Sequence, residues 1–367
     1  MPGRAQSPGQ VALRWIIGIA VGVGFTWLAS SSWPMDALFA GTLHLESGAF
    51  GPTVAMRVPG GPASWSVSLA HILGYTALLV VIHFWRVWRW DPLVRPFGKV
   101  PLAVLNRDGA IGFMGVFLLP LRLGEFVRPM LLTRDSNIAF GTNLSMIAVE
   151  RIADGLMVTL MFFAVLMQVP ASALARRSQV TLGPWQLSDV ELGAWAALGI
   201  FGAAMAALAA TAFARQATTR LIGATLGRLS GKLAGKILGL LTSFVDGLRV
   251  LGSPSAVFGF VSLTAAYWLT NGFGYWLLAQ GFGLNLSLTG GYAMMCCVII
   301  GMMIPNSPGN VGSFWYFLLL PASLFGIDGG APRAIAFALA LWALQLVQVV
   351  VFGLWGQWAR NRVLQRA

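Results

Sequence analysis

Eight long apolar stretches decide what this chain can fold into. Six of them reach the roughly 20 residues that an α-helix needs to cross a bilayer, and two are shorter. Charged residues make up only 10% of the chain, against roughly 25% in soluble domains. The stretches lie at residues 11–32, 65–85, 142–168, 193–213, 256–280, 288–304, 313–327 and 334–358. We therefore predict an all-α, polytopic membrane protein of about eight transmembrane helices, forming a single domain over residues 1–367.

The chain carries 24 basic and 12 acidic residues, a net charge of +12. In a soluble protein this excess would suggest a nucleic-acid partner, but in a membrane protein basic residues gather in cytoplasmic loops and meet anionic headgroups. Most of them precede the first apolar stretch or follow the second, fourth and eighth, and the opposite side receives Arg57, Arg176, Arg177 and Arg333. The pattern predicts a bacterial cytoplasmic (inner) membrane protein with both termini in the cytoplasm and no nucleic-acid partner.

The first stretch has an alternative interpretation as a cleaved signal peptide. Arg14 precedes an apolar run that ends at the small residues Ala29, Ser30 and Ser31. The run is long for a signal peptide, and its loss would leave an odd number of spans. We therefore expect the first span to be retained.

Two segments between the apolar stretches differ from them in composition. Residues 34–64 contain four prolines and are expected to form a loosely structured external loop. Residues 215–250 combine six basic residues with apolar residues at every third or fourth position, which predicts an amphipathic cytoplasmic segment. Its basic face fits the inner membrane surface, and packing on its own bundle or on a second subunit is the alternative.

A third segment, residues 108–134, begins with an apolar part too short to cross a membrane. This part is followed by the helix breakers Pro120 and Gly124 and by charged residues, Arg122, Glu125 and Arg128 among them. Irregular backbone at membrane depth is tolerated only inside protein or beside a wet cavity. The segment is therefore predicted to be a re-entrant hairpin that enters from the cytoplasmic side, with the three charged side chains on one face.

Three further charges, Glu150, Arg151 and Asp154, lie within two turns of the third apolar stretch. An ionisable residue costs about 2.5–3.5 kcal/mol near the centre of a membrane, so such residues normally face a cavity or a partner. With Arg122, Glu125 and Arg128 the charges sum to zero. Two interpretations remain open: an ion-pair network that pins the hairpin to the span, or a polar groove for a zwitterionic or phosphate-bearing headgroup. In the groove, Arg128 would contact phosphate through its planar guanidinium.

A second break, the broken-helix element at residues 304–313, separates the sixth and seventh stretches. Its prolines stop a helix, and its glycines allow close approach of the backbone. A helix that starts near Ser313 would point its positive end at the break, which makes an anion site plausible beside the alternative of an ordinary turn. Interrupted hydrophobic segments in both halves of a chain are a pointer to a transport site. The candidate substrate-binding residues are Arg122, Glu125, Arg128, Glu150, Arg151, Asp154, Pro305, Asn306, Ser307, Pro308, Gly309 and Gly312.

No motif for catalysis, metal or cofactor is found. Cys296 and Cys297 are adjacent within an apolar stretch, and the three histidines are scattered. We therefore predict no cofactor, no metal and no catalytic residue. Trp85, Trp88 and Trp90 beside Arg86 and Arg89 are typical of an interfacial aromatic belt. The isolated polar residues Asn271, Gln345 and Gln348 are expected to form hydrogen bonds between helices.

Four motifs resemble, in order, those of the lysylphosphatidylglycerol synthase transmembrane region, also called the flippase-like integral membrane family. They are Arg86–Trp90, Leu119–Arg128, Glu150–Asp154 and Pro305–Gly312. The resemblance covers nearly the whole chain. It implies an inner-membrane protein of about eight helices with re-entrant elements, related to the flippase half of the multiple peptide resistance factor. Relatives are linked to hopanoid and isoprenoid-linked glycan pathways.

The sequence departs from that family in two ways. The family often has an acidic residue shortly after the Pro-Gly break, where this chain has Trp315, so the role of that carboxylate does not carry over. The chain ends at Ala367 with no soluble aminoacyltransferase domain, so we expect no tRNA-dependent aminoacylation of lipid.

We expect a flippase-like transporter that moves or binds a phosphate-bearing or isoprenoid-linked lipid across the cytoplasmic membrane. Its partners would be membrane lipids, anionic or zwitterionic, and association with a second copy or with envelope-pathway enzymes is left open. No P-loop is present, so a gradient, the membrane potential or mass action would drive transport. The alternatives are a membrane-embedded lipid-linked transferase and a non-transporting accessory subunit of a lipid or cell-envelope pathway.

Overall fold

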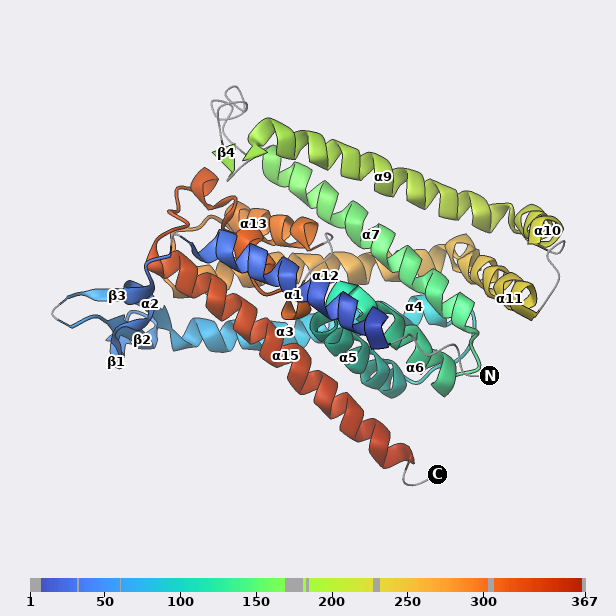
Figure 1. Cartoon of the computed structure of the whole chain (residues 1–367), viewed down its shortest axis with the longest axis horizontal. Helices are drawn as coiled ribbons and strands as arrows, with labels where there is room; N and C mark the ends of the chain where they lie inside the picture. The colour runs from blue at the N-terminus through green and yellow to red at the C-terminus, as the bar shows by residue number, and fades with distance from the viewer. Residues whose placement is uncertain are drawn as a thin grey trace.

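The computed structural model describes residues 8–31, 33–59, 61–168, 181–182, 185–226, 232–302 and 307–364. Within these ranges the chain is mostly helical (Figure 1). The α-helices are α1 (Pro8–Ser30), α2 (Met35–Phe39), α3 (Leu69–Trp88), α4 (Asp91–Val94), α5 (Leu102–Leu118), α6 (Val127–Asp135), α7 (Phe140–Leu166), α9 (Leu187–Phe213), α10 (Arg215–Leu226), α11 (Lys232–Gly247), α12 (Pro254–Gly281), α13 (Leu288–Gly301), α14 (Ser313–Leu319) and α15 (Pro332–Leu364). The 3-10 helices are η1 (Pro120–Phe126), η2 (Leu248–Gly252), η3 (Pro308–Asn310) and η4 (Ala322–Phe325).

Each of the eight apolar stretches coincides with a helix: α1, α3, α7, α9, α12, α13, α14 and α15. Within the described residues, three helical segments are long and apolar enough to cross a membrane: Leu69–Val94, Glu191–Phe213 and Pro332–Arg362. A fourth is added if Gly235–Gly252 and Pro254–Gly281, bent by 86°, form one span. The chain is therefore a multi-pass membrane protein, and eight crossings stay a prediction.

Helix α7 is one of the predicted spans that are not among these candidate spans. It is 27 residues long, but its middle carries Glu150, Arg151 and Asp154. α13 and α14 have only 14 and 7 residues, too few to cross a bilayer separately. α7 and the end of α13 line the cavity described below.

The helices pack into one bundle around an aromatic and aliphatic core. α3 packs against α12, α5 against α15, and α7 against both α9 and α11. Tyr75, Tyr275, Cys296 and Phe337 lie in the main core, where each is almost completely buried. A second core contains Trp90 and the buried side chains of α6 and α7. α9 lies at the edge of the bundle (Figure 1).

Residues 34–64 are not loosely structured, as the prolines had suggested. Most of them belong to α2 and to an antiparallel sheet of β1 (Thr42–Gly48), β2 (Gly51–Arg57) and β3 (Ala63–Ser68), in that order. The glycines and prolines mark the turns, while Val54, Met56, Trp65 and Val67 alternate along the strands and pack on the bundle. The start of α1 and the end of α15 lie at the opposite end of the bundle from this sheet (Figure 1). A further short pair, β4 (Thr181–Leu182) and β5 (Trp185–Gln186), precedes α9.

The amphipathic segment 215–250 forms α10, α11 and η2. α11 packs on α7, where the Thr142 hydroxyl donates a hydrogen bond to the Ser243 carbonyl at 2.9 Å. Gly141 permits this approach, since a Cβ there would overlap the backbone of α11 at Leu240. α11 therefore packs on its own bundle, and the contact of its basic face with the inner membrane surface stays a prediction.

Candidate functional site

The predicted hairpin at residues 108–134 is formed by α5, η1 and α6, and its first helix begins at Leu102. Leu119 is extended and Pro120 starts the 3-10 turn, which ends α5. Gly124 then lies directly against the backbone of Gly115 and Val116 on α5. The hairpin closes because position 124 has no side chain.

Glu150 on α7 is the centre of a buried charged network. Its side chain is 0% exposed and accepts hydrogen bonds from Arg89, Arg128, Arg151 and the indole nitrogen of Trp90. The Arg151 Nη2 atom lies 2.6 Å from Glu150 Oε1. Three guanidinium groups and one indole thus donate hydrogen bonds to a single carboxylate. These bonds connect the end of α3 and the start of α6 to α7.

Asp154, one turn further along α7, completes the network. Arg89 donates to both of its carboxylate oxygens, at 2.5 Å and 3.0 Å. The Trp268 indole of α12 donates to Oδ1 at 2.9 Å, and Arg151 Nη2 lies 3.2 Å from Oδ2. Arg89 and Arg151 each contact both carboxylates, so these two arginines join Glu150 to Asp154.

Arg128, Glu150, Arg151 and Asp154 of this network were candidate residues from the sequence, and Arg89 and Trp90 were not. Trp90 and Arg89 were predicted to belong to an interfacial belt, and this is wrong: they are only 2% and 1% exposed. α3 ends at Trp88, and the turn into α4 directs both side chains into the protein. A signal was available, because two carboxylates four residues apart inside a span require cations nearby.

The charged residues of the hairpin differ in what they contribute to the site. Arg128 pairs with Glu150, and its guanidinium carbon lies 3.8 Å from the centroid of the Trp90 ring. Glu125 lines the cavity described below and attracts Arg151 electrostatically. The side chain of Arg122 lies outside the described residues.

Arg86 differs from the other arginines of the site. Its guanidinium carbon lies 3.7 Å from the centroid of the Phe113 ring, and it lies near Tyr267. Its Nε atom, like that of Arg89, is buried without a hydrogen-bond partner in the described structure. Among the described residues no carboxylate forms an ion pair with it.

A cavity of about 480 Å³ lies against this network, and residues from both halves of the chain line it. Its charged lining residues are Arg86, Arg89, Glu125, Arg128, Arg151 and Asp154. Together with the buried Glu150, four guanidinium groups face three carboxylates. The described residues therefore leave an excess of one positive charge at the cavity, in place of the neutral set expected from the sequence.

The rest of the cavity wall is neutral and partly polar. The Gln345 amide donates to the hydroxyls of Tyr75 at 3.0 Å and Tyr275 at 3.4 Å, which confirms an interhelical role. Gln348 lies 3.5 Å from His83 Nδ1 on α3. Asn271 donates instead to the carbonyl of its own helix, so the interhelical prediction for it is wrong. All three of the predicted polar residues line the cavity.

Of the described residues of the predicted break, Asn310, which was not among the candidate residues, lines the cavity. Its φ of +53° is unusual for a residue with a side chain. Gly309 (φ +69°) accepts a hydrogen bond from the Trp342 indole at 2.8 Å, and Gly312 (φ +81°) lies against α1. Ser307 donates to the Val311 carbonyl at 2.9 Å. Pro308 opens η3 and, like these three residues, does not line the cavity.

The expected helix does begin at Ser313, but it has only seven residues. Pro305 and Asn306 lie outside the described residues. The described part of the break is a tight turn that packs between α1 and α15 and directs Asn310 to the cavity. It does not direct a long helix end at the cavity, as an anion site of the expected kind would.

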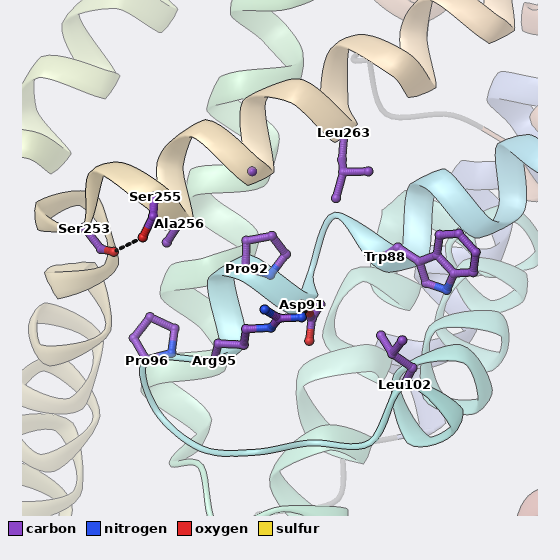
Figure 2. Close-up of a pocket in the computed structure, with 11 residues that line it drawn as sticks. Trp88, Asp91, Pro92, Arg95, Pro96, Leu102, Ser253, Ser255, Ala256 and Leu263 are labelled. Carbon is purple, nitrogen blue, oxygen red and sulfur yellow. Dashed lines mark hydrogen bonds and ion pairs between the residues drawn. The ribbon is translucent and has the colours of Figure 1, made fainter.

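A second cavity of about 480 Å³ lies between α4 and the first turns of α12 (Figure 2). Trp88, Pro92, Leu102 and Leu263 give it largely apolar walls (Figure 2). Arg95 pairs with Asp91 at 2.6 Å, so this pair leaves no excess charge. Within the described ranges, no group of three or more His, Cys, Asp or Glu side chains could hold a metal ion. The central cavity is therefore the candidate site.

Comparisons with known proteins agree with this architecture. The family described as "Lysylphosphatidylglycerol synthase TM region" matches residues 15–356. A protein named "Glycosyltransferase AglD", from Haloferax volcanii, is 26% identical over 278 residues. The alignment covers 71% of this chain and 45% of that relative, so the chain spans about half of the relative's length. No solved structure matches.

Proposed function

The chain belongs to the lysylphosphatidylglycerol synthase transmembrane-region family, and from this premise we propose that it is a flippase-like lipid transporter. The central cavity binds the phosphate-bearing headgroup of a membrane lipid, including an isoprenoid-linked one, while the acyl or isoprenoid chains stay in the bilayer. The α5–α6 hairpin enters a bacterial inner membrane from the cytoplasmic side, where both termini lie. The position of the start of α1 and the end of α15 opposite the sheet supports this orientation (Figure 1).

The observation that carries the proposal is the excess positive charge at the cavity. A single unpaired guanidinium in a cavity of low polarity favours an anion, and its planar fork matches two phosphate oxygens. Arg86 is placed for this contact because it lines the cavity and has no carboxylate partner among the described residues.

Arg128 was the phosphate contact suggested by the sequence, but in this proposal it has a structural role. It pairs with Glu150 and stacks on Trp90, as Arg89 and Arg151 pair with Glu150 and Asp154. These three arginines hold the hairpin, α3 and α7 in place around the cavity. In this proposal the structural-network interpretation applies to Arg89, Arg128 and Arg151. The polar-groove interpretation applies to Arg86.

A lipid-linked transferase is the second candidate, and the name of the archaeal relative favours it. In that case a carboxylate of the cavity wall would act as a base. Glu150 and Asp154 are unsuited because arginine and tryptophan side chains donate to both and they are only 0% and 6% exposed, which leaves Glu125. A chemically altered lipid in extracts of expressing cells would establish this candidate, and unaltered lipids would remove it.

Lipids that co-purify with the protein test the proposal. We expect mass spectrometry to find an anionic lipid enriched over the bulk membrane in the wild type and lost from Arg86→Gln. The matched control is Arg95→Gln, which removes an exposed guanidinium paired with Asp91 and should keep the lipid. Bulk membrane lipids in all three preparations would contradict binding in the cavity and favour an accessory role.

A further inference from the structure

The turn of the β1–β2 hairpin lies beside the first turn of a membrane-spanning helix. Gly48 pairs with Gly51 across the turn, and the Phe50 ring packs edge-on against His71, with centroids 5.1 Å apart. His71 belongs to α3, which starts at Leu69 and opens the apolar segment Leu69–Val94. Phe50 is therefore at the depth at which a span begins.

This turn is apolar and uncovered. Phe50 is 69% exposed, and so is Leu73 in the first turns of α3. An apolar side chain on the outside of a spanning helix faces lipid, because the bilayer core contains no water. Through its contact with His71, the hairpin turn lies at the level of the first turns of α3, where Leu73 faces lipid.

The first strand continues the apolar surface away from the turn. Leu43 and Leu45 are 62% and 70% exposed, and alternation places them on the face opposite to His44 and Glu46. Their cross-strand partners, Met56 and Val54, pack on the bundle, so β1 extends beyond it. The edge strand thus presents apolar side chains without protein cover.

The strands also set the depth of each residue, because they run roughly along the direction of α3 (Figure 1). Across the sheet, Leu45 is in register with Val67, which lies two residues before Leu69. Leu43 is in register with Trp65, which lies four residues before Leu69. At about 3.3 Å per residue these rows lie about 7 Å and 13 Å outside the start of the span. The headgroup layer of one leaflet is about 5–7 Å thick.

We propose that the β1–β2 hairpin inserts its turn into the leaflet beside it and anchors this end of the bundle to lipid. Phe50 lies at the hydrocarbon boundary, Leu45 in the headgroup layer and Leu43 at its aqueous edge. The partner is the membrane lipid itself, and the anchor does not depend on what the central cavity binds or moves.

Spin labels on the full chain in liposomes test the anchor. Single variants Phe50→Cys, Leu45→Cys and Leu43→Cys carry the label, and Cys296 and Cys297 are buried and spared. Collisions with oxygen, which concentrates in hydrocarbon, are compared with collisions with a water-soluble nickel chelate. Leu73→Cys is the lipid control, and Gly61→Cys, at the far turn of the sheet, is the aqueous control.

The oxygen-to-nickel ratio should fall in the order Phe50, Leu45, Leu43. The value at Phe50 should be close to that at Leu73 and several-fold above that at Gly61. Equal ratios at Phe50 and Gly61 would overturn the proposal, because the turn would then be in water. Shielding of all three labels from both reagents would also overturn it, since a protein surface would then cover the hairpin. Both readouts are independent of lipid transport.

Discussion

Glu150→Gln should lower the free energy of unfolding by about 3–5 kcal/mol, the usual cost of removing one partner from a buried ion pair. Glu150 is fully buried and compensates Arg89, Arg128 and Arg151. The amide keeps the size of the side chain but removes its charge, so three guanidinium groups would share Asp154 alone among the described carboxylates of the network. The hairpin, which Arg128 connects to α7, should detach first.

The midpoint of thermal unfolding in detergent measures this effect. Asp91→Asn is the matched control, because it removes a carboxylate from the pair with Arg95, whose side chain is 74% exposed. An exposed pair contributes about 0–1 kcal/mol, so the control should unfold close to the wild type. A Glu150→Gln midpoint equal to that of the control would show that the network does not stabilise the fold.

Gly124→Ala should prevent the hairpin from closing. A Cβ at this position would lie inside the backbone of Gly115 and Val116, far within van der Waals contact. Backbone cannot move aside as a flexible side chain can, so the cost should be at or above the roughly 1–3 kcal/mol typical of overpacking. Because Glu125 and Arg128 follow on the same turn, cavity binding should be lost together with stability.

Gly239→Ala is the matched control for this substitution. Nothing lies within 4 Å of a Cβ at this position in α11, and alanine favours a helix over glycine by about 1 kcal/mol. We expect this variant to unfold at or above the wild-type temperature and Gly124→Ala to unfold well below it. Equal unfolding temperatures for the two variants would contradict the close packing of the hairpin.

The positions of the helices follow from the sequence because long apolar stretches and their breaks dictate them. The eight stretches, the hairpin and the start of α14 at Ser313 are found where the sequence predicted them. The sheet was missed because its short strands carry prolines and glycines that are typical of loops. Its stability comes from packing of Trp65 and Val67 on the bundle, which no local pattern reveals.

The site was harder to predict than the fold because pairing is a property of the tertiary structure. Charges inside a span marked Glu150, Arg151 and Asp154 directly. Arg89 and Arg86 stand three residues apart in a motif that is typical of a membrane interface, yet Arg89 pairs with two carboxylates and Arg86 lacks a carboxylate partner among the described residues. Only the arrangement of α3, α7 and α12 distinguishes them.

The most direct test of the central claim is the rate at which a fluorescent phosphatidylglycerol crosses liposomes that contain the purified protein. The wild type and Arg95→Gln should accelerate exchange between the leaflets. Arg86→Gln, folded to the same extent, should be slower by about tenfold to a hundredfold, the loss expected for a charge-assisted hydrogen bond of about 1.5–3 kcal/mol. Equal rates for the wild type and Arg86→Gln would contradict the account.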